Sequence, residues 1–424
     1  MKRITSIPVI AAAMLAMSAV SANAMDVNNC KDLFHCLNNS IDITLTSDIK
    51  MDNKAFKDYI DYEHTPCYRA TFDGQGHKIY GIDGCSKGAT NIGLIHWSNF
   101  AKIKNVTVEY DRLTAERFVG GIVGQARNTS IDNCHVKGYL TSVAYTRSDI
   151  GGIVGKGTNC YITNCTADIN IYADGDDVGG IIGNGTEHNI IRNCQTDGCI
   201  FADGNSTDAN CGGIVGSINA GEDYVDIIDC INNSRVDAKS SCVGGIVGYV
   251  SEAGNLVIDN CVNNGAVAAH AGGIFASDLS RFYGGIIGDL REGKTFVTNC
   301  TNTGAISGDS GIGAFVGKAF KDTTKARFEN CNAGGKIYTK DTDANAFCGG
   351  GIDNIIIVNP TNTAEVYRNN QRIDSNSTQS LASDLDVQPA EPAKQDAAKK
   401  VMAGGKLTLV KSNGQIVDIS GMMR

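Results

Sequence analysis

A short motif, an Asn or Asp followed directly by cysteine, recurs at intervals of 29 to 39 residues in seven copies, which end at Cys134, Cys165, Cys194, Cys230, Cys261, Cys300 and Cys331. Each copy follows, by 13 to 17 residues, a Gly-Gly or near-Gly-Gly pair that opens a short aliphatic run, as in Gly120-Gly121-Ile122-Val123-Gly124. Self-similarity at such a period is the sequence signature of a solenoid, in which each repeat buries its apolar face against the next. The chain is therefore expected to form one elongated stack rather than several globular domains.

The unit 151–178 indicates how one repeat folds. Gly152-Ile153-Val154-Gly155 predicts a first short strand, Cys160–Ala167 a second strand with a break in it, and Ile169–Tyr172 a third. Parallel strands usually need helical crossovers, but here the next repeat supplies the parallel partner. The pattern predicts a mainly β protein, a single-stranded right-handed parallel β-helix of about eight to ten rungs.

The Asn or Asp of each motif lies where the chain must turn. In Ile131-Asp132-Asn133-Cys134 the apolar residue and the cysteine are three apart, so both can face inward only if a bulge or corner intervenes. Asn and Asp tolerate a left-handed corner better than other non-glycine residues; N-glycosylation or ligand contact is the alternative role. The predicted corner residues are Asn133, Asn164, Asn193, Asp229, Asn260, Asn299 and Asn330.

The cysteines of the motif are expected to stack in the interior, since equivalent residues of adjacent rungs lie about 4.8 Å apart and cysteine behaves as a small apolar side chain. Val106 occupies the equivalent place in the first full repeat, which favours packing over chemistry. Metal binding is the less favoured alternative, because no CxxC pair accompanies the column. The predicted ladder is Cys134, Cys165, Cys194, Cys230, Cys261, Cys300 and Cys331.

Nine further cysteines raise the question of disulfides, which export would permit. The plausible local pairs are Cys30 with Cys36, Cys67 with Cys85, and Cys199 with Cys211, and the sequence does not decide whether any of them forms. The nine are Cys30, Cys36, Cys67, Cys85, Cys160, Cys199, Cys211, Cys242 and Cys348.

The amino-terminal residues have the features of a secretory signal peptide. Lys2 and Arg3 precede an apolar stretch, and Ala22-Asn23-Ala24 offers a cleavage site; an uncleaved anchor is the alternative. Removing the two cations moves the formal charge from −9 to −11. An acidic chain is not expected to bind nucleic acid, because nucleic-acid-binding proteins neutralise phosphates with Lys and Arg. No later apolar run reaches the length of a membrane span.

Both ends of a solenoid need covers. A short amphipathic helix starting near Asp26 is expected to cover the amino end, followed by a first strand at Ile41–Ile49. Near the carboxy terminus, an Asn-Gly turn at Asn413-Gly414 between alternating apolar runs predicts a hairpin. The favoured role of this hairpin is a signal for export or attachment machinery, and a cover for the last rung is the alternative. The predicted domains are a signal peptide (1–24), an N-terminal cap (25–65), the β-helix (66–360), a flexible polar linker (361–401) and a C-terminal hairpin that is a candidate sorting tail (402–424).

The successive Gly-Gly-Ile-Val-Gly units, with Thr71–His77 and Ile103–Val108, resemble the GLUG repeat of secreted bacterial proteins. Members carry it in large surface proteins and beside an IgA-cleaving metallopeptidase domain. The resemblance covers roughly residues 30–358 and implies a β-helix and export, but not an activity. The tail 402–424 is similar to export tails of some Gram-negative surface proteins. That similarity implies export machinery as a partner and a secreted or cell-surface location, with the periplasm as the alternative.

Two repeats depart from the pattern. The interval between Gly245 and Gly285 is 40 residues and contains an additional segment, Ala271–Phe275, which predicts an enlarged rung or an insertion. Ala314 stands where the second glycine of its unit belongs, which predicts a tighter or shifted turn.

Patterns for catalysis are weak. A zinc peptidase needs His-Glu-x-x-His, and the seven histidines form no such pair. A glycan hydrolase needs two carboxylates about 5–10 Å apart, which the groups Asp174, Asp176, Asp177 and Asp223, Asp226, Asp229 could supply; the first group is also a weak candidate for calcium. A glycine-rich phosphate-binding loop is followed by a helix, whereas the Gly-Gly pairs here are followed by strands. Nucleotide binding is therefore not expected.

Two functional hypotheses follow. The favoured one is a non-catalytic exported β-helix, a surface adhesin or a scaffold that binds a glycan or host ligand. The alternative is a polysaccharide-cleaving β-helix enzyme, a lyase or a glycoside hydrolase. The expected partner is thus an extracellular glycan or cell-surface ligand. No cofactor, no nucleic acid and no membrane span after signal cleavage are expected.

Overall fold

The fold is taken from a computed structural model. It describes residues 24–60, 67–85, 88–143, 148–174, 177–202, 209–239, 242–269, 281–308, 311–320, 324–339, 347–368, 371–373, 399–403, 406–410 and 416–418. The predicted signal peptide (apart from Ala24), the additional segment Ala271–Phe275 and the turn Asn413-Gly414 lie outside the described residues.

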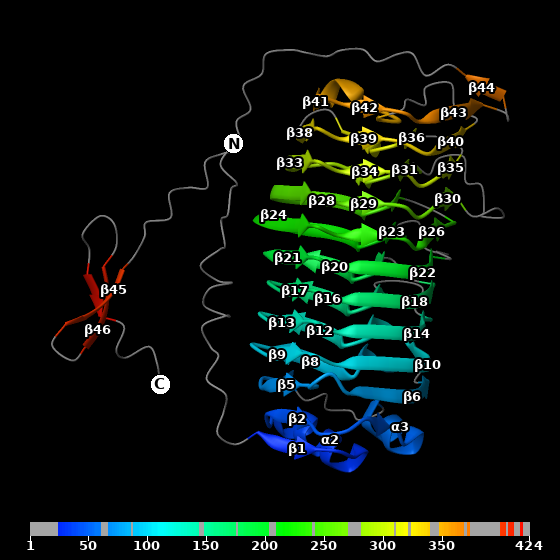
Figure 1. Cartoon of the computed structure of the whole chain (residues 1–424). Coiled ribbons are helices and arrows are strands. Elements are labelled where there is room, and N and C mark those ends of the chain that lie inside the picture. The colour runs from blue at the N-terminus through cyan, green and yellow to red at the C-terminus, as the bar shows by residue number, and fades with distance from the viewer. Residues whose placement is uncertain are drawn as a thin grey trace. The chain divides into compact units, whose positions relative to one another are not determined.

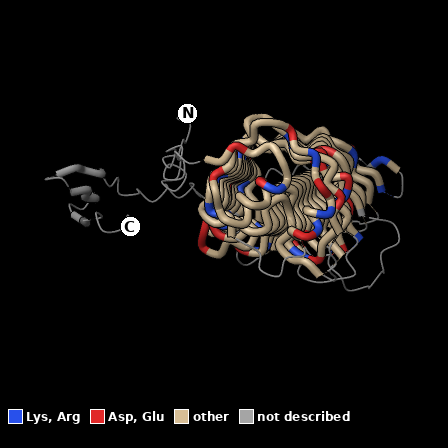
Figure 2. Tube along the Cα trace, turned by 90° about the horizontal axis from the view of Figure 1, so that it is seen from below, with Lys and Arg blue, Asp and Glu red and all other residues tan. Residues whose placement is uncertain are grey.

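The described residues up to Ile373 form a β-solenoid of about nine turns, so the predicted parallel β-helix is confirmed. Figure 1 shows the rungs stacked one upon another, and viewed along the axis they superpose as a coil (Figure 2). Strands of successive rungs pair in parallel, as in Val123 with Val154 and Val154 with Ile182. Each rung passes through three sheets, here called A, B and C.

Sheet C has eight strands, one per rung. They are β7 (Thr90–Ile92), β11 (Arg117–Gly120), β15 (Asp149–Gly151), β19 (Asp177–Gly179), β23 (Asn210–Gly212), β27 (Cys242–Gly244), β31 (Phe282–Gly284) and β36 (Ile312–Gly313).

Sheet A follows sheet C along each rung and usually contributes two strands separated by a corner. Its strands are β1 (Met25–Val27), β2 (Ile43–Leu45), β4 (Cys67–Tyr68), β5 (Thr71–Asp73), β8 (Ile95–Asn99), β9 (Lys102–Lys104), β12 (Val123–Arg127), β13 (Ser130–Asp132), β16 (Val154–Thr158), β17 (Tyr161–Thr163), β20 (Ile182–Thr186), β21 (Asn189–Arg192), β24 (Val215–Ile228), β28 (Val247–Asp259), β32 (Ile287–Leu290), β33 (Gly293–Thr298), β37 (Val316–Ala319), β38 (Thr324–Glu329) and β41 (Ile355–Val358).

Sheet B begins just after the predicted Asx-Cys corner. Its strands are β3 (Ile49–Lys50), β6 (Lys78–Cys85), β10 (Thr107–Ala115), β14 (His135–Ser142), β18 (Thr166–Ala173), β22 (Gln195–Ala202), β25 (Ile231–Asn232), β26 (Arg235–Ala238), β29 (Val262–Asn263), β30 (Val267–Ala269), β34 (Thr301–Asn302), β35 (Ile306–Gly308), β39 (Asn332–Ala333), β40 (Lys336–Thr339), β42 (Thr361–Asn362), β43 (Glu365–Arg368) and β44 (Gln371–Ile373).

The amino end carries a helical cap, but the helix begins later than predicted. Residues Met25–Val27 are strand β1, paired with β2, and helix α2 runs from Cys30 to Asn39. Asn29 starts the helix because its side chain accepts a hydrogen bond from the backbone N–H of Asp32 (3.0 Å). A second helix, α3 (Asn53–Ile60), was not predicted; its buried Phe56, Tyr59 and Ile60 pack over the first rungs.

The β-helix also extends further than predicted at its carboxy end. Strands β42 and β43 continue the last rung to Arg368, inside the segment 361–401 that was expected to be a linker, and β44 pairs antiparallel with β43. A 3-10 helix, η1 (Ile352–Asn354), precedes β41. The polar composition of 361–373 is compatible with a strand because much of this outermost rung faces solvent.

The carboxy-terminal residues belong to a separate compact unit. Within it β46 (Lys406–Val410) pairs antiparallel with β47 (Ile416–Asp418), as the hairpin prediction requires. A third strand, β45 (Lys399–Ala403), pairs with the other edge of β46 and begins inside the predicted linker. No helix in the described part of the chain has the length and apolar character needed to cross a membrane.

The second glycine of each pair is required by close packing between rungs. A Cβ atom added at Gly213 would lie 2.1 Å from the carbonyl oxygen of Gly245 and 2.3 Å from Cγ of the buried Asn232. Any side chain there would collide with the backbone of the next rung. Ala314 stands in place of the second glycine of its rung. In that rung the buried asparagine of earlier rungs, such as Asn232, is replaced by the smaller Ala333.

One buried histidine makes the stability of the amino-terminal rungs depend on pH. His96 in β8 is fully buried, stacks on Tyr59 with ring centroids 4.1 Å apart, and has no hydrogen-bond partner at either ring nitrogen. Burial lowers the pKa of His96 from 6.5 to about 4. Between these values the unfolded chain binds a proton that the folded chain does not. The free energy of unfolding therefore falls as pH drops from 6.5 to 4, by about 3 kcal/mol at most.

The variant His96→Phe isolates this contribution, because phenylalanine keeps the stacking and cannot be protonated. Denaturant unfolding at pH 7 and at pH 4.5 is expected to show a smaller loss of stability for the variant than for the wild type. Equal losses in the two proteins would mean that carboxylates alone cause the acid sensitivity.

Candidate functional site

A hollow of about 440 Å³ lies on the outer face of sheet B near its amino-terminal end. Alternate residues of β6, β10, β14 and β18 line it, because side chains on a strand point outward at every second position. The lining residues are Asp48, Gly76, Lys78, Thr107, Glu109, His135, Lys137 and Thr166.

The hollow is polar and its charges are mixed. Nζ of Lys78 lies 3.4 Å from Oε2 of Glu109, and Nδ1 of His135 lies 2.7 Å from Oγ1 of Thr166. Burial, and secondarily the neighbouring cation Lys137, lower the pKa of His135, which keeps its ring neutral near pH 7. The hollow thus presents donors and acceptors without a large net charge.

Aromatic rings continue the same face toward the next rungs. Tyr139 on β14 is 57% exposed, and Tyr172 on β18 is 44% exposed. Tyr172 pairs in register with Phe201 on β22, and their ring centroids lie 5.1 Å apart. Lys137 and Tyr139 are two residues apart on one strand and share its outer face. Polar hollow and aromatic rings therefore form one surface, called here the sheet-B face.

The aspartate group Asp174, Asp176 and Asp177, the weak candidate for calcium, lies only partly within the described residues. Asp177 is buried and accepts hydrogen bonds from Nδ2 of Asn184 (2.6 Å) and Nδ2 of Asn210 (2.9 Å). Asp174 ends the rung before it, and Asp176 lies outside the described residues. Among the described residues, no three His, Cys, Asp or Glu side chains are placed to hold a metal ion.

The second aspartate group is divided between two environments. Oδ1 of Asp223 lies 3.4 Å from Nε2 of His188, whose ring meets that of Tyr224 edge-on. Burial raises the pKa of Asp226 on the same strand, although Arg192 and His188 oppose the shift. Asp229 instead lies at the corner and accepts a hydrogen bond from Asn260 (2.7 Å). Asp223 and Asp226 are the carboxylates that would serve a hydrolase.

All seven predicted corner residues adopt the left-handed conformation, with φ between 50° and 55°. Their side chains also bond from rung to rung: Asn133 donates to Asn105 (2.8 Å), and Asn193 donates to Asn164 (2.7 Å). Amides at these exposed positions therefore build an external ladder, a role that the corner geometry alone did not predict.

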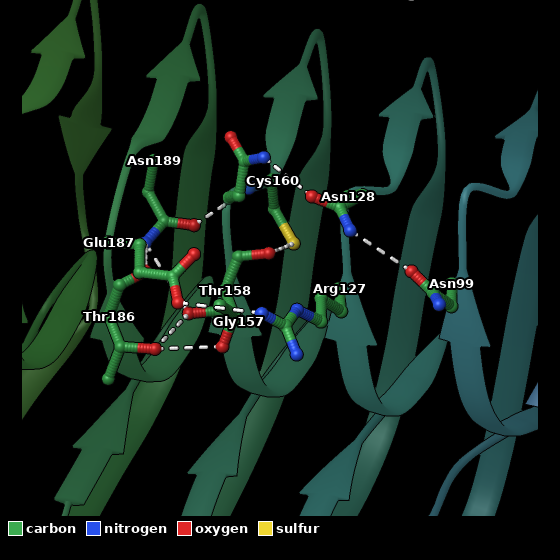
Figure 3. Close-up of polar contacts among 10 residues, drawn as sticks. Asn99, Arg127, Asn128, Gly157, Thr158, Cys160, Thr186, Glu187 and Asn189 are labelled. Carbon is green, nitrogen blue, oxygen red and sulfur yellow. Dashed lines mark hydrogen bonds and ion pairs between the residues drawn. The ribbon is translucent and has the colours of Figure 1, made fainter. Parts of the chain in front are cut away.

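A second row of corners separates the two strands of sheet A. Asn128 donates to Asn99 (3.1 Å) and Asn159 donates to Asn128 (2.6 Å), while Arg127 reaches along the row to Glu187 (3.7 Å). Figure 3 shows these contacts running from rung to rung, with Cys160 beside them. The sequence signal for this row is weaker, because only Asn159 of these three asparagines is followed by a cysteine.

The seven ladder cysteines are buried, and no disulfide links any of the 16 cysteines, so none of the three plausible pairs is bonded. Sγ of Cys165 donates to the carbonyl of Thr163 (3.1 Å), two residues earlier, and the other ladder thiols repeat this contact. Burial raises the pKa of Cys165 far above its usual range. A buried thiol of raised pKa is a poor nucleophile and metal ligand.

An internal asparagine column lies next to the cysteines and was not predicted. Asn232 donates to Asn263 and Asn263 donates to Asn302, both at 2.7 Å, and all three side chains are fully buried. The signal is present in the sequence: in three successive repeats the motif cysteine is followed, two residues later, by asparagine.

Residues 119–143 match the family model described as the GLUG motif. The matched segment includes a Gly-Gly pair, the corner Asn133 and the ladder Cys134, and the resemblance to GLUG-repeat proteins is thereby confirmed. No curated protein matches the chain significantly. Among solved structures, a candidate immunoglobulin A1 protease from Bacteroides ovatus is 21% identical with a TM-score of 0.39, over 63% of this chain and 78% of that one.

Proposed function

We propose that this protein is a non-catalytic exported β-helix that binds an extracellular glycan or another cell-surface ligand through the sheet-B face. It would act as a surface adhesin or a host-binding scaffold. The observation that carries the proposal is the continuity between the polar hollow and the exposed aromatic rings of Tyr139 and Tyr172.

Saccharides combine hydroxyl groups with apolar ring faces, and the sheet-B face offers a partner for each. Thr107, Glu109 and Lys137 can exchange hydrogen bonds with hydroxyl groups. Tyrosine rings contribute a large apolar area with a polar tip and lose little conformational entropy on binding. A rigid sheet holds these groups in place before the ligand arrives, which lowers the cost of association.

The proposal also includes the cellular location of the protein and a role for its carboxy-terminal unit. A signal peptide at 1–24 would lead the chain out of the cytoplasm. The small sheet of β45, β46 and β47 would then be recognised by export or attachment machinery, which would leave the protein secreted or at the surface of a Gram-negative cell. Retention in the periplasm is the alternative.

Binding of the purified chain to a panel of neutral and acidic polysaccharides tests the proposal. We expect Tyr139→Ala and Tyr172→Ala each to weaken binding by about tenfold, the loss of one aromatic contact. Tyr338→Ala is the matched control. Tyr338 is also an exposed tyrosine of sheet B that stacks on the ring of the next strand, Tyr367, but it lies several rungs away from Tyr139 and Tyr172. Equal weakening by all three variants would argue against the sheet-B face.

The enzyme hypothesis makes a different prediction on the same panel. It expects release of reducing or unsaturated ends, and loss of that release in Asp223→Asn or Asp226→Asn. The raised pKa of Asp226 beside His188 is the observation that favours it. Turnover that depends on either aspartate would replace the proposed binding function.

A further inference from the structure

Phe100 is the most exposed large hydrophobic side chain in the described part of the chain, at 63%. It also has φ of 58°, the left-handed region that a bulky side chain rarely adopts. Phe100 stands at the second row of corners, between β8 and β9. Phe100 therefore lowers the stability of the folded protein in two ways, through backbone strain and through an apolar surface left in water.

The neighbouring rungs show what this position needs for folding alone. The equivalent residues Asn128 and Asn159 have φ of 47° and 54°, and their amides form the row of hydrogen bonds in Figure 3. An asparagine at position 100 would tolerate the conformation and could extend that row. The architecture does not account for phenylalanine, and unexplained strain at an exposed residue points to a function.

Cationic side chains surround this corner, although the chain as a whole is acidic. Tyr68 and Ala126 both pair with Ser98, so the residues that follow them, Arg69 and Arg127, lie on either side of Asn99. Arg69 and Arg127 are exposed, and Lys102 is half-buried on the strand after Phe100. In the described part of the chain, neither Arg69 nor Lys102 forms an ion pair.

We propose that Phe100, Arg69, Lys102 and Arg127 form a second binding site, separate from the sheet-B face, for an acidic polysaccharide. The three cations lie on neighbouring rungs, about 4.8 Å apart along the axis, and can pair with carboxylate or sulfate groups repeated along a chain. The ring of Phe100 stacks against a sugar ring between them.

Arg127 is the cation of this site that has an ion-pair partner among the described residues, and that ion pair does not prevent binding. Arg127 lies 3.7 Å from Glu187, and both side chains are about half exposed, so this ion pair is weak and can exchange for a ligand anion. Nucleic acid is the less suitable polyanion, because three cations in an acidic chain neutralise few phosphates. Local cations can nevertheless concentrate an anionic polymer at one corner.

Equilibrium binding of the full chain to polygalacturonate, a carboxylated polymer, and to heparin, a sulfated one, tests the site at several salt concentrations. We expect binding to at least one of them, weakening as salt rises. Phe100→Asn should weaken it about tenfold, the loss of one stacking contact, while its thermal midpoint stays equal to that of the wild type or rises. Arg69→Met and Lys102→Met should each reduce the salt dependence.

Lys294→Met is the matched control, because it removes one exposed cation from β33, several rungs away. It should bind as the wild type does. The proposal fails if neither polymer binds, if Phe100→Asn binds unchanged, or if Lys294→Met weakens binding as much as Lys102→Met. Tighter binding to single-stranded DNA than to both polymers would also overturn it. Since Tyr139 and Tyr172 are not involved, these outcomes are independent of the test of the sheet-B face.

Discussion

Replacing Cys230 by arginine is expected to prevent folding of the β-helix. The Cys230 side chain is fully buried in the middle of the thiol column, where Sγ contacts the carbonyl oxygens of Ile228 (3.3 Å) and Ile191 (3.7 Å). A guanidinium group there would have no carboxylate partner and would also overfill the interior. An uncompensated buried charge costs at least about 4 kcal/mol, a large part of the stability of a typical domain.

The conservative variant Cys230→Val separates charge from the loss of the thiol. Valine is apolar and similar in size, and Val106 already occupies the equivalent buried place in an earlier rung. We expect Cys230→Val to be soluble with a far-ultraviolet circular dichroism spectrum like that of the wild type, and Cys230→Arg to be insoluble or unfolded. If the arginine variant folds with an unchanged midpoint, the column is not a packed interior.

Much of the fold can be predicted from the repeat, because every rung of a solenoid has the same local backbone conformation and the same packing against its neighbours. The Gly-Gly pair, the corner asparagine and the cysteine are each required by the backbone conformation or by packing against the next rung. The residues that they contact there lie about one repeat away in the sequence. Helix α3 was missed because it lies before the repeats begin, and β42 because a strand of the outermost rung has only one neighbour and needs little apolar sequence.

The candidate site is less predictable because outward-facing residues are not constrained by the repeat. Tyr172 and Phe201 share one offset within their repeats, but Tyr139 stands two residues earlier in its own, and the register of β14, β18 and β22 brings all three onto one face. The aspartates illustrate the converse: Asp226 and Asp229 are near in sequence, yet the corner at Asp229 directs one to the His188 cluster and the other to the amide ladder.

The internal asparagine column leads to the second large effect, in Asn263→Leu. Leucine keeps the branched arrangement of the four side-chain heavy atoms of asparagine but is larger and apolar, so packing becomes tighter and two neighbours lose their partners. Asn232 then has no acceptor for the amide hydrogen it gives to Oδ1 of Asn263, and Oδ1 of Asn302 loses its donor. Each buried polar group left unpaired costs about 1–3 kcal/mol, so we expect a loss of about 4 kcal/mol in the free energy of unfolding.

The adjacent Asn264→Ala is the control, since Nδ2 of Asn264 donates to Asn233 at the exposed surface (2.9 Å). Water can replace that bond, and its loss should cost less than about 0.5 kcal/mol. Urea denaturation of both variants, followed by circular dichroism, measures the difference directly. Similar midpoints for Asn263→Leu and the wild type would show that the column adds specificity of rung register rather than stability. A large difference between the two neighbouring asparagines would show that burial, not residue type, determines what an amide ladder contributes.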